Sequence, residues 1–217
     1  MSEVVMNLSL LWCAAGGYLA GSVPFGLVLC YIWGYGDIRK IGSGNIGATN
    51  VLRTGNKFLA VLTVLLDAFK AGLAAYIASK FLPNENISVC GFDVSLNQFG
   101  ALLAGTCGVL GHNFPIWLKF KGGKGVSSAF GMILFTQWQL ALIALAVWLV
   151  MAFTFRYSSL SALTAAAAVP VFAYFLCPPV YAFFYTAIAL LVIIRHHANI
   201  ARLLKGEESK INLKKKA

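Results

Sequence analysis

The sequence predicts an all-α integral membrane protein with seven transmembrane helices, its N-terminus outside and its C-terminus in the cytoplasm. The mean hydropathy of +0.79 and the 59% of hydrophobic residues are too high for a soluble domain. Seven apolar runs alternate with short polar segments whose basic residues fall almost entirely on one side of the predicted bundle. We expect residues 1–217 to form a single polytopic membrane domain.

The predicted spans follow one another with short connections. They are residues 8–33, 58–82, 96–118, 126–137, 138–155, 160–177 and 179–196. A spanning helix needs about 20 mainly apolar residues, so the short fourth run is the weakest candidate. The first run follows an acidic rather than a basic segment and is longer than a signal-peptide core, so we expect it to be retained as a span.

The boundary between the fourth and fifth spans decides the topology, because only Gln137-Trp138-Gln139 separates them. One helix over 126–155 would leave six spans. With seven spans, one face collects nearly all basic loop residues: Arg39, Lys40, Arg53, Lys57, Lys119, Lys121, Lys124, Arg156, Arg195, Arg202, Lys205, Lys210 and Lys214 to Lys216. The opposite face keeps Lys80 with Glu3, Glu85 and Asp93. The positive-inside rule therefore favours seven spans, and Lys214 to Lys216 are expected to attract anionic lipid.

Neither a metal nor a disulfide is expected. Four cysteines lie inside apolar runs, Cys90 lies in a loop, and no CxxC or Cys/His spacing occurs, so we interpret them as small packing residues. The carboxylates on or near the basic face do not cluster as a hard cation requires: Asp37, Asp67, Glu207 and Glu208. We therefore predict no metal and no cofactor.

Four polar segments on the predicted cytoplasmic face are candidate active-site loops: 34–57, 119–125, 156–159 and 195–208. Non-helical backbone near membrane depth is tolerated only inside protein or beside a wet cavity, so these loops indicate a pocket. The segment GSGNIGATN, residues 42–50, suits a phosphate because glycines let successive N–H groups turn inward. The alternative is a simple glycine-rich turn between helices.

The segment KFKGGKG places Lys124 between glycines, at Gly122, Gly123 and Gly125. Its ammonium can therefore lie beside exposed backbone donors. The spacing GxxxxGK[ST] is absent and no strand is expected there, which argues against a nucleotide site.

Cationic and imidazole side chains mark the same face. Arg53 extends the first loop by one helical turn, and its planar fork can bind phosphate oxygens in pairs. Arg156 and Arg195 end predicted helices, where they could equally be snorkelling residues. His196 and Asn199 are three residues apart and can face one cavity. We expect His197 to be exposed at the surface. His112 lies in a glycine-rich helix, and we expect it to be packed and hydrogen-bonded.

Asp67 and Lys70 are three residues apart inside the second span, where two charges are costly unless they meet. We interpret them as a structural brace beneath the site. Direct contact with substrate is the alternative.

These segments, in this order, resemble the acyl-phosphate-dependent glycerol-3-phosphate acyltransferase family of bacteria, known as PlsY. The resemblance covers nearly the whole chain through GSVPFG, IGSGNIGATNVLR, LLDAFKAG, GHNFPIWLKFKGGKGV, RYSSL and RHHANIARLLKGEE. It implies a seven-helix enzyme of the inner membrane that moves a fatty acyl group from acyl phosphate to the 1-hydroxyl of glycerol 3-phosphate, giving lysophosphatidic acid and phosphate. Ala71 and Ala162 stand where the family usually has glycine and serine, and Gly72 is expected to compensate for the first change.

The resemblance also implies residue roles. Acyl phosphate would be held by the first loop, and glycerol 3-phosphate by Arg53, Lys124, Ser159, His196 and Asn199. The expected catalytic residues are Lys124, His196, Asn199 and Ser43. The expected substrate-binding residues are Gly42, Gly44, Asn45, Gly47, Thr49, Asn50, Arg53, Gly122, Gly123 and Ser159. No aspartate lies four residues beyond a histidine, so we favour a substrate phosphate oxygen over His196 as proton acceptor.

The implied partners are acyl phosphate, glycerol 3-phosphate and membrane lipid, without nucleic acid, and we expect a monomer. An organophosphate transporter is the main alternative, because it would also need cationic pockets in a helix bundle. Transporters place binding groups near the midplane of broken helices, whereas here the cations lie at one face. A lipid-binding scaffold would not need two glycine-rich loops.

Overall fold

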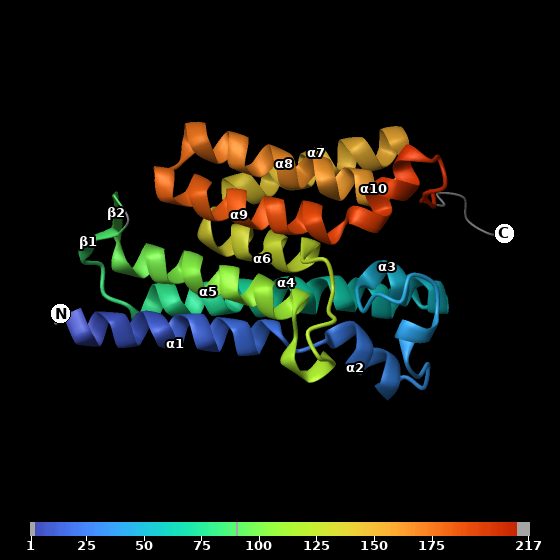
Figure 1. Ribbon diagram of the computed structural model, residues 1–217, viewed down its shortest axis with the longest axis horizontal. Helices are drawn as coiled ribbons and strands as arrows, with labels where there is room; N and C mark the ends of the chain where they lie inside the picture. Colours follow the sequence, from blue (N-terminus) through green and yellow to red (C-terminus); the bar gives the residue numbers. More distant parts are fainter. Residues whose placement is uncertain (1–2, 90, 212–217) are drawn as a thin grey trace. The chain divides into compact units, whose positions relative to one another are not determined.

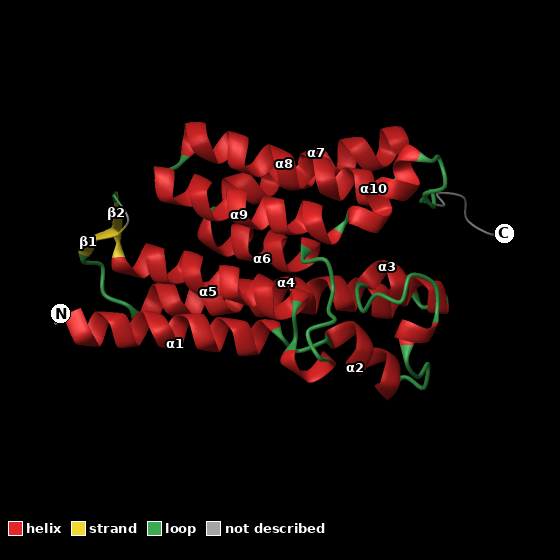
Figure 2. Cartoon of the chain, viewed as in Figure 1, coloured by secondary structure: helices red, strands yellow, loops and turns green. Residues whose placement is uncertain are grey.

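The structure is a computed structural model that describes residues 3–89 and 91–211 (Figure 1). Helices form nearly all of the regular structure in this part of the chain (Figure 2). The chain divides into two compact units, unit 1 up to Gln137 and unit 2 from Trp138 onward. Cys90 and Lys214 to Lys216, for which the sequence made predictions, lie outside the described residues.

The described part of unit 1 is built on the long helices α1 (Glu3–Gly21), α4 (Lys57–Phe81) and α5 (Leu96–Asn113) and the shorter α6 (Val126–Thr136), joined by irregular segments. Its other helices are α2 (Phe25–Ile32) and α3 (Ala48–Val51). Short 3-10 turns cover Ile38–Lys40, Leu52–Thr54 and Ile116–Leu118. Helix α5 packs against α1, α4 and α6, and α4 also packs against α6 (Figure 1).

Glycines set the close approach of these helices. A Cβ atom at Gly21 would overlap the backbone of Gly108, and one at Gly111 would overlap the backbone of Tyr18. Small residues let helix backbones meet where lipid-like surroundings provide no hydrophobic driving force. The predicted close packing of the glycine-rich third run is therefore confirmed.

The first predicted span consists of two helices rather than one. Helix α1 ends at Gly21, and α2 begins at Phe25 after Pro24. Proline has no N–H to donate and its ring clashes with the preceding turn, which explains a break at this point. Together the two helices form an apolar stretch over 5–32 that is long enough to cross a membrane.

A β-hairpin joins α4 to α5, and the all-α expectation missed it. Strand β1 (Asn86–Val89) pairs antiparallel with β2 (Phe92–Ser95), with Asn86 opposite Ser95. The alternation of polar and apolar residues over 86–95 is the period-two pattern of a strand. Gly91, at φ 81°, adopts the left-handed conformation that suits a tight turn.

Unit 2 contains α7 (Trp138–Phe155), α8 (Ser158–Leu176), α9 (Pro179–Arg195) and α10 (His197–Leu204). Helix α8 packs between α7 and α9, and the short α10 contacts both α8 and α9. The axis bends by 60° between α9 and α10, with His196 at the junction.

Within residues 3–89 and 91–211, five stretches are long and apolar enough to span a membrane, namely 5–32, 57–81, 96–118, 138–155 and 158–176, and α9 with α10 makes a sixth if the bent pair counts as one. Helix α6, at 11 residues, is shorter than a normal span. Helix α6 ends at Thr136 and α7 begins at Trp138, so the continuous helix over 126–155 is wrong. The protein is thus a multi-pass helical membrane protein, while seven spans and their orientation stay predictions.

Candidate active site

Asn50 organises the first predicted loop. Its side chain is buried in α3, and its Nδ2 donates to the backbone carbonyls of Ile38 and Asn45 at 2.7 and 2.8 Å. Its Oδ1 accepts the Ser43 N–H at 3.3 Å. An amide has two N–H donors, and both serve the backbone here, so the contacts of Asn50 shape the loop.

The loop shaped in this way exposes groups that can bind an anion. Gly42 and Gly44 have φ values of 55° and 69°, a left-handed conformation that glycine adopts without strain. The side chains of Ser43, Thr49 and Arg53 are exposed, and the Arg53 side chain lies over the Cα of Gly42. The Ser43 and Thr49 hydroxyls and the Arg53 guanidinium are donors that can bind a phosphate, whereas the backbone N–H groups of Ser43, Gly44 and Gly47 already donate within the loop.

Two further contacts fix the loop. The side chain of Ile46 is buried in a cluster with residues of α2, α3 and α4, which ties the loop to the helix bundle. The Arg39 guanidinium makes an ion pair with Asp37 at 2.6 Å and, mainly through this hydrogen bonding, lowers the pKa of that carboxyl from 3.8 to about 2. The positive charge of Arg39 is therefore neutralised by Asp37 within the same loop.

The second predicted loop is held by the end of α5. Gly123 N–H donates to the carbonyl of His112 at 3.0 Å, and Gly122 N–H donates to the carbonyl of Asn113 at 3.2 Å. Lys119 and Phe120 both have left-handed φ values, at 51° and 63°, which is uncommon for residues with a Cβ atom. The half-buried Lys124 follows this turn and precedes α6.

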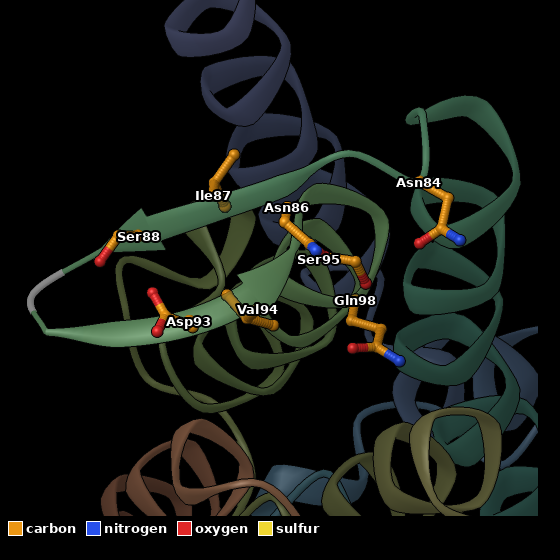
Figure 3. Close-up of a pocket in the computed structure, with 8 residues that line it drawn as sticks. All are labelled: Asn84, Asn86, Ile87, Ser88, Asp93, Val94, Ser95 and Gln98. Carbon is orange, nitrogen blue, oxygen red and sulfur yellow. The ribbon is translucent and has the colours of Figure 1, made fainter.

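Both loops lie at the same end of unit 1, where α4 and α6 begin and α5 ends (Figure 1). An open polar hollow of about 730 Å³ lies at the other end, beside the hairpin (Figure 3). Its lining includes Asn84, Asn86, Asp93, Ser95 and Gln98. None of the predicted site residues lines this hollow.

Asp67, Lys70 and His112 form a buried cluster in unit 1. Lys70 Nζ lies 2.8 Å from Asp67 Oδ1 and 3.0 Å from His112 Nδ1. The ion pair has the geometry of the predicted brace, although the role stays a prediction. His112 is packed and hydrogen-bonded, as expected. Ala71 lies against Gly108, whereas Gly72 faces Phe135 and Gly131 on α6, so Gly72 does not replace a glycine at 71.

In unit 2, a carboxylate that the sequence did not mark as functional joins two predicted site residues. Glu208 Oε1 accepts from Ser159 Oγ at 2.8 Å and from Asn199 Nδ2 at 2.7 Å, and Oε2 accepts from Arg202 Nε at 2.6 Å. Burial raises the pKa of Glu208, but these hydrogen bonds outweigh it and lower the pKa below its ordinary value. Glu208 therefore stays ionised and holds both residues. Its only sequence signal is an acidic pair in a basic segment.

His196 lies at the junction of α9 and α10 and is buried, as is Asn199. The Nδ1 atom of His196 lies 2.7 Å from the Val192 carbonyl, so Nδ1 carries the hydrogen and, in the neutral ring, Nε2 is the accepting nitrogen. His197 is exposed, which confirms the surface position. Arg156, at φ 66°, donates to the Ile211 carbonyl, and Arg195 is half-buried at the end of α9.

The predicted site residues thus fall into two sets, one in each unit. The set in unit 1 comprises Gly42, Ser43, Gly44, Asn45, Gly47, Thr49, Asn50, Arg53, Gly122, Gly123 and Lys124, and the set in unit 2 comprises Ser159, His196 and Asn199. Across 3–89 and 91–211, no three or more histidine, cysteine, aspartate or glutamate side chains gather as metal ligands. The cysteines at 13, 30 and 107 are free thiols.

Comparison with known proteins connects this arrangement to one activity. A family model described as glycerol-3-phosphate acyltransferase matches residues 11–206. The chain is 54% identical over its full length to a glycerol-3-phosphate acyltransferase of Rhodospirillum rubrum, of which it covers 98%. Over 96% of its length it is 51% identical to the protein of that name from Mesorhizobium japonicum, all of which is covered.

Two crystal structures are also similar. Both are of PlsY, an integral membrane glycerol 3-phosphate acyltransferase, one in a glycerol 3-phosphate form and one in a lysophosphatidic acid form. The TM-scores are 0.83 and 0.80 at 37% sequence identity, over 94% of this chain and 96% of the PlsY chain.

Proposed function

The chain belongs to the glycerol-3-phosphate acyltransferase family, and from that premise we propose that its acyl donor is acyl phosphate. In this reaction the 1-hydroxyl oxygen of glycerol 3-phosphate attacks the acyl carbon. The bond from that carbon to the phosphate oxygen breaks, and the hydroxyl proton leaves to an acceptor. The products are lysophosphatidic acid and inorganic phosphate. The organophosphate transporter is not supported, because the relatives are named acyltransferases.

The shape of the first loop carries this proposal. Acyl phosphate is a mixed anhydride with a good leaving group, so an enzyme needs chiefly to position it and to stabilise negative charge. The exposed Ser43 hydroxyl and the Arg53 guanidinium, held beside the glycine turn at Gly42 and Gly44, offer donors of the kind that a phosphate accepts. Asn45, Gly47 and Thr49 complete this turn, while Asn50 holds its backbone in place.

After Arg53, Lys124 is the second cationic residue of the proposed site in unit 1. It follows the Gly122-Gly123 turn and lies two residues before Val126, the first residue of α6, near a helix N-terminus whose dipole favours anions. We assign to it the stabilisation of charge that develops on the acyl carbonyl and on the leaving phosphate.

The residues of unit 2 suit glycerol 3-phosphate. The Ser159 hydroxyl donates its hydrogen to Glu208, so its oxygen is left to accept a hydrogen bond from a substrate hydroxyl. Asn199 donates to Glu208 as well, and Arg202 is neutralised by the same carboxylate. Glu208 thus orients Ser159 and Asn199 toward a polyol.

His196 is assigned to substrate binding rather than to proton abstraction. In serine-type catalytic groups a carboxylate holds Nδ1 and stabilises the imidazolium. Here a backbone carbonyl, that of Val192, holds Nδ1. We therefore favour a phosphate oxygen of the substrate as proton acceptor, with no acyl-enzyme intermediate.

The family premise also supports a location in the inner membrane, with seven spans, the N-terminus outside, the candidate loops in the cytoplasm and a monomeric protein. The positive-inside bias of the loops supports this orientation.

Purified protein in liposomes tests the donor. With glycerol 3-phosphate and acyl phosphate, we expect lysophosphatidic acid to form without any divalent cation, because lysine and arginine supply the positive charge. Acyl-CoA in place of acyl phosphate should give no product. Robust activity with acyl-CoA alone would refute the proposal, as would a loss of activity in EDTA that magnesium restores.

A further inference from the structure

A buried lysine in unit 1 contacts polar atoms of three different segments. Lys70 Nζ lies 2.8 Å from Asp67 Oδ1, 3.0 Å from His112 Nδ1 and 2.8 Å from the Val23 carbonyl oxygen. The Lys70 side chain is only 4% exposed. The ammonium thus forms an ion pair with the Asp67 carboxylate and lies within hydrogen-bond distance of His112 Nδ1 and the Val23 carbonyl.

These contacts fix the protonation pattern of His112. Lys70 Nζ pairs with the Asp67 carboxylate and donates to the Val23 carbonyl, so it is an ammonium without a lone pair, and Nδ1 of His112 accepts from it. Asp67 Oδ1 is 3.6 Å from the same nitrogen, too far for a hydrogen bond that would compete. A neutral ring whose Nδ1 accepts carries its hydrogen on Nε2.

The Nε2 side of the ring faces the second candidate loop. Nε2 of His112 is the atom nearest to the place that a Cβ on Gly123 would occupy, and the two would overlap. The backbone of the same residue accepts the Gly123 N–H at 3.0 Å. One residue therefore supports the turn directly before Lys124 through both its ring and its carbonyl.

The start of this loop is tied to the same network. Lys70 holds Val23 in the break between α1 and α2. Trp117 Nε1 donates to Ser22 Oγ at 2.8 Å, next to Val23. A displacement of Lys70 would therefore disturb the segment before Lys124 at both of its ends. It would act through Val23 at the Trp117 end and through His112 at the Gly123 end.

We propose that Lys70 locks His112 in its Nε2–H tautomer, and that this N–H side supports the Gly122-Gly123 turn, so that Lys70 and His112 are positioning residues for Lys124. The proposal rests on the role of Lys124 in the proposed function. A purely structural brace would stabilise the helices whichever nitrogen carried the hydrogen.

Two substitutions at one position separate these cases. In His112→Asn the side-chain oxygen can replace Nδ1 as the acceptor for Lys70, but nothing replaces Nε2. In His112→Gln the amide N–H can reach the place of Nε2, but Lys70 loses its acceptor. We expect His112→Asn to keep the wild-type melting temperature and to lower kcat roughly 10- to 100-fold, because small misplacements of a catalytic group are costly. We expect His112→Gln to melt lower and to keep more of the activity.

The exposed His197 provides the matched control, since His197→Asn should change neither quantity. Wild-type kcat in His112→Asn would overturn the proposal. So would a loss of kcat that follows the melting temperature in both His112 variants, because that is the behaviour of a brace alone.

The tautomer can be measured without any substrate. The chain has three histidines, so nitrogen-15 spectra of histidine-labelled protein in detergent can be assigned with the three single variants. We expect His112 to be protonated on Nε2 only, and Lys70→Met to release it into a mixture of tautomers. Protonation on Nδ1 in the wild type would overturn the proposal. The tautomer is measured independently of activity. If acyl phosphate is not the donor, only the liposome assay will therefore show it.

Discussion

The hydrogen bonds that Glu208 accepts from Ser159, Asn199 and Arg202 give a quantitative prediction for Glu208→Gln. The glutamine oxygen can still accept from Ser159 and Asn199, but its amide hydrogens then face the Arg202 Nε–H, a donor against a donor. A hydrogen bond to a charged group contributes about 1.5–3 kcal/mol, and because the Arg202 side chain is 39% exposed we take a value of about 2 kcal/mol. For a chain of this size that lowers the melting temperature by roughly 4–8 °C.

The pH dependence of this loss has a definite sign. The folded-state pKa of Glu208 lies below its unfolded value, so the stabilisation is fully present above the ordinary carboxyl pKa of about 4.3 and disappears as the pH falls through the folded-state value. The gap in melting temperature between the wild type and Glu208→Gln should therefore be constant from pH 7 to pH 5 and narrow below that range.

Thermal melting of detergent-solubilised protein across this pH range measures the effect, and Glu207→Gln is the matched control. Glu207 is the preceding residue, is exposed, and carries the same charge. Equal losses in the two variants would refute the reasoning, because a general charge effect would then suffice. Glu208→Gln should also raise the KM for glycerol 3-phosphate, since Ser159 and Asn199 are held less firmly.

Further predictions follow from the two sets of site residues and from the topology. Asn50→Ala should lower kcat/KM for acyl phosphate by about 100-fold, because two backbone carbonyls lose their partner and the loop can no longer hold its turn; the exposed Asn84→Ala is the control, and unchanged kinetics in Asn50→Ala would contradict the role. His196→Asn should raise the KM for glycerol 3-phosphate, whereas a fall in kcat of about 10²- to 10⁴-fold at normal KM would identify it as the base instead. A reporter fused after Lys205 should be cytoplasmic and one inserted at Asn86 external, and finding both on one side would reject the seven-span topology.

The helices were predictable because apolar periodicity and length are local properties. Each of the seven apolar runs is helical, and the break at Gln137 lies inside the polar patch that was expected to separate two spans. The break at Pro24 was missed although its signal was present, because a single proline inside a long apolar run was outweighed by hydropathy. The hairpin is hard to predict because each of its strands has only four residues, which is too short for the alternation of polar and apolar residues to stand out.

The candidate site was predictable as a set of residue types but not as a set of contacts. The glycines of the two loops and the position of Lys124 are visible in the sequence. The contact from Ser159 to Glu208 joins residues 49 apart, and no spacing rule connects them. Likewise, the sequence suggests that Asn50 can bind an anion, whereas the fold turns its two amide hydrogens toward the backbone.

The central claim is acyl transfer from acyl phosphate to glycerol 3-phosphate through attack on the acyl carbon, and an oxygen-18 label on the 1-hydroxyl of glycerol 3-phosphate tests it most directly. With purified protein in liposomes and unlabelled acyl phosphate, mass spectrometry should find the label in the ester of lysophosphatidic acid and none in the phosphate, with the two products formed in equal amounts. Label in a second phosphate ester of glycerol with release of free fatty acid, which would follow from attack on phosphorus, or phosphate released without an equal amount of lysophosphatidic acid, would contradict the account.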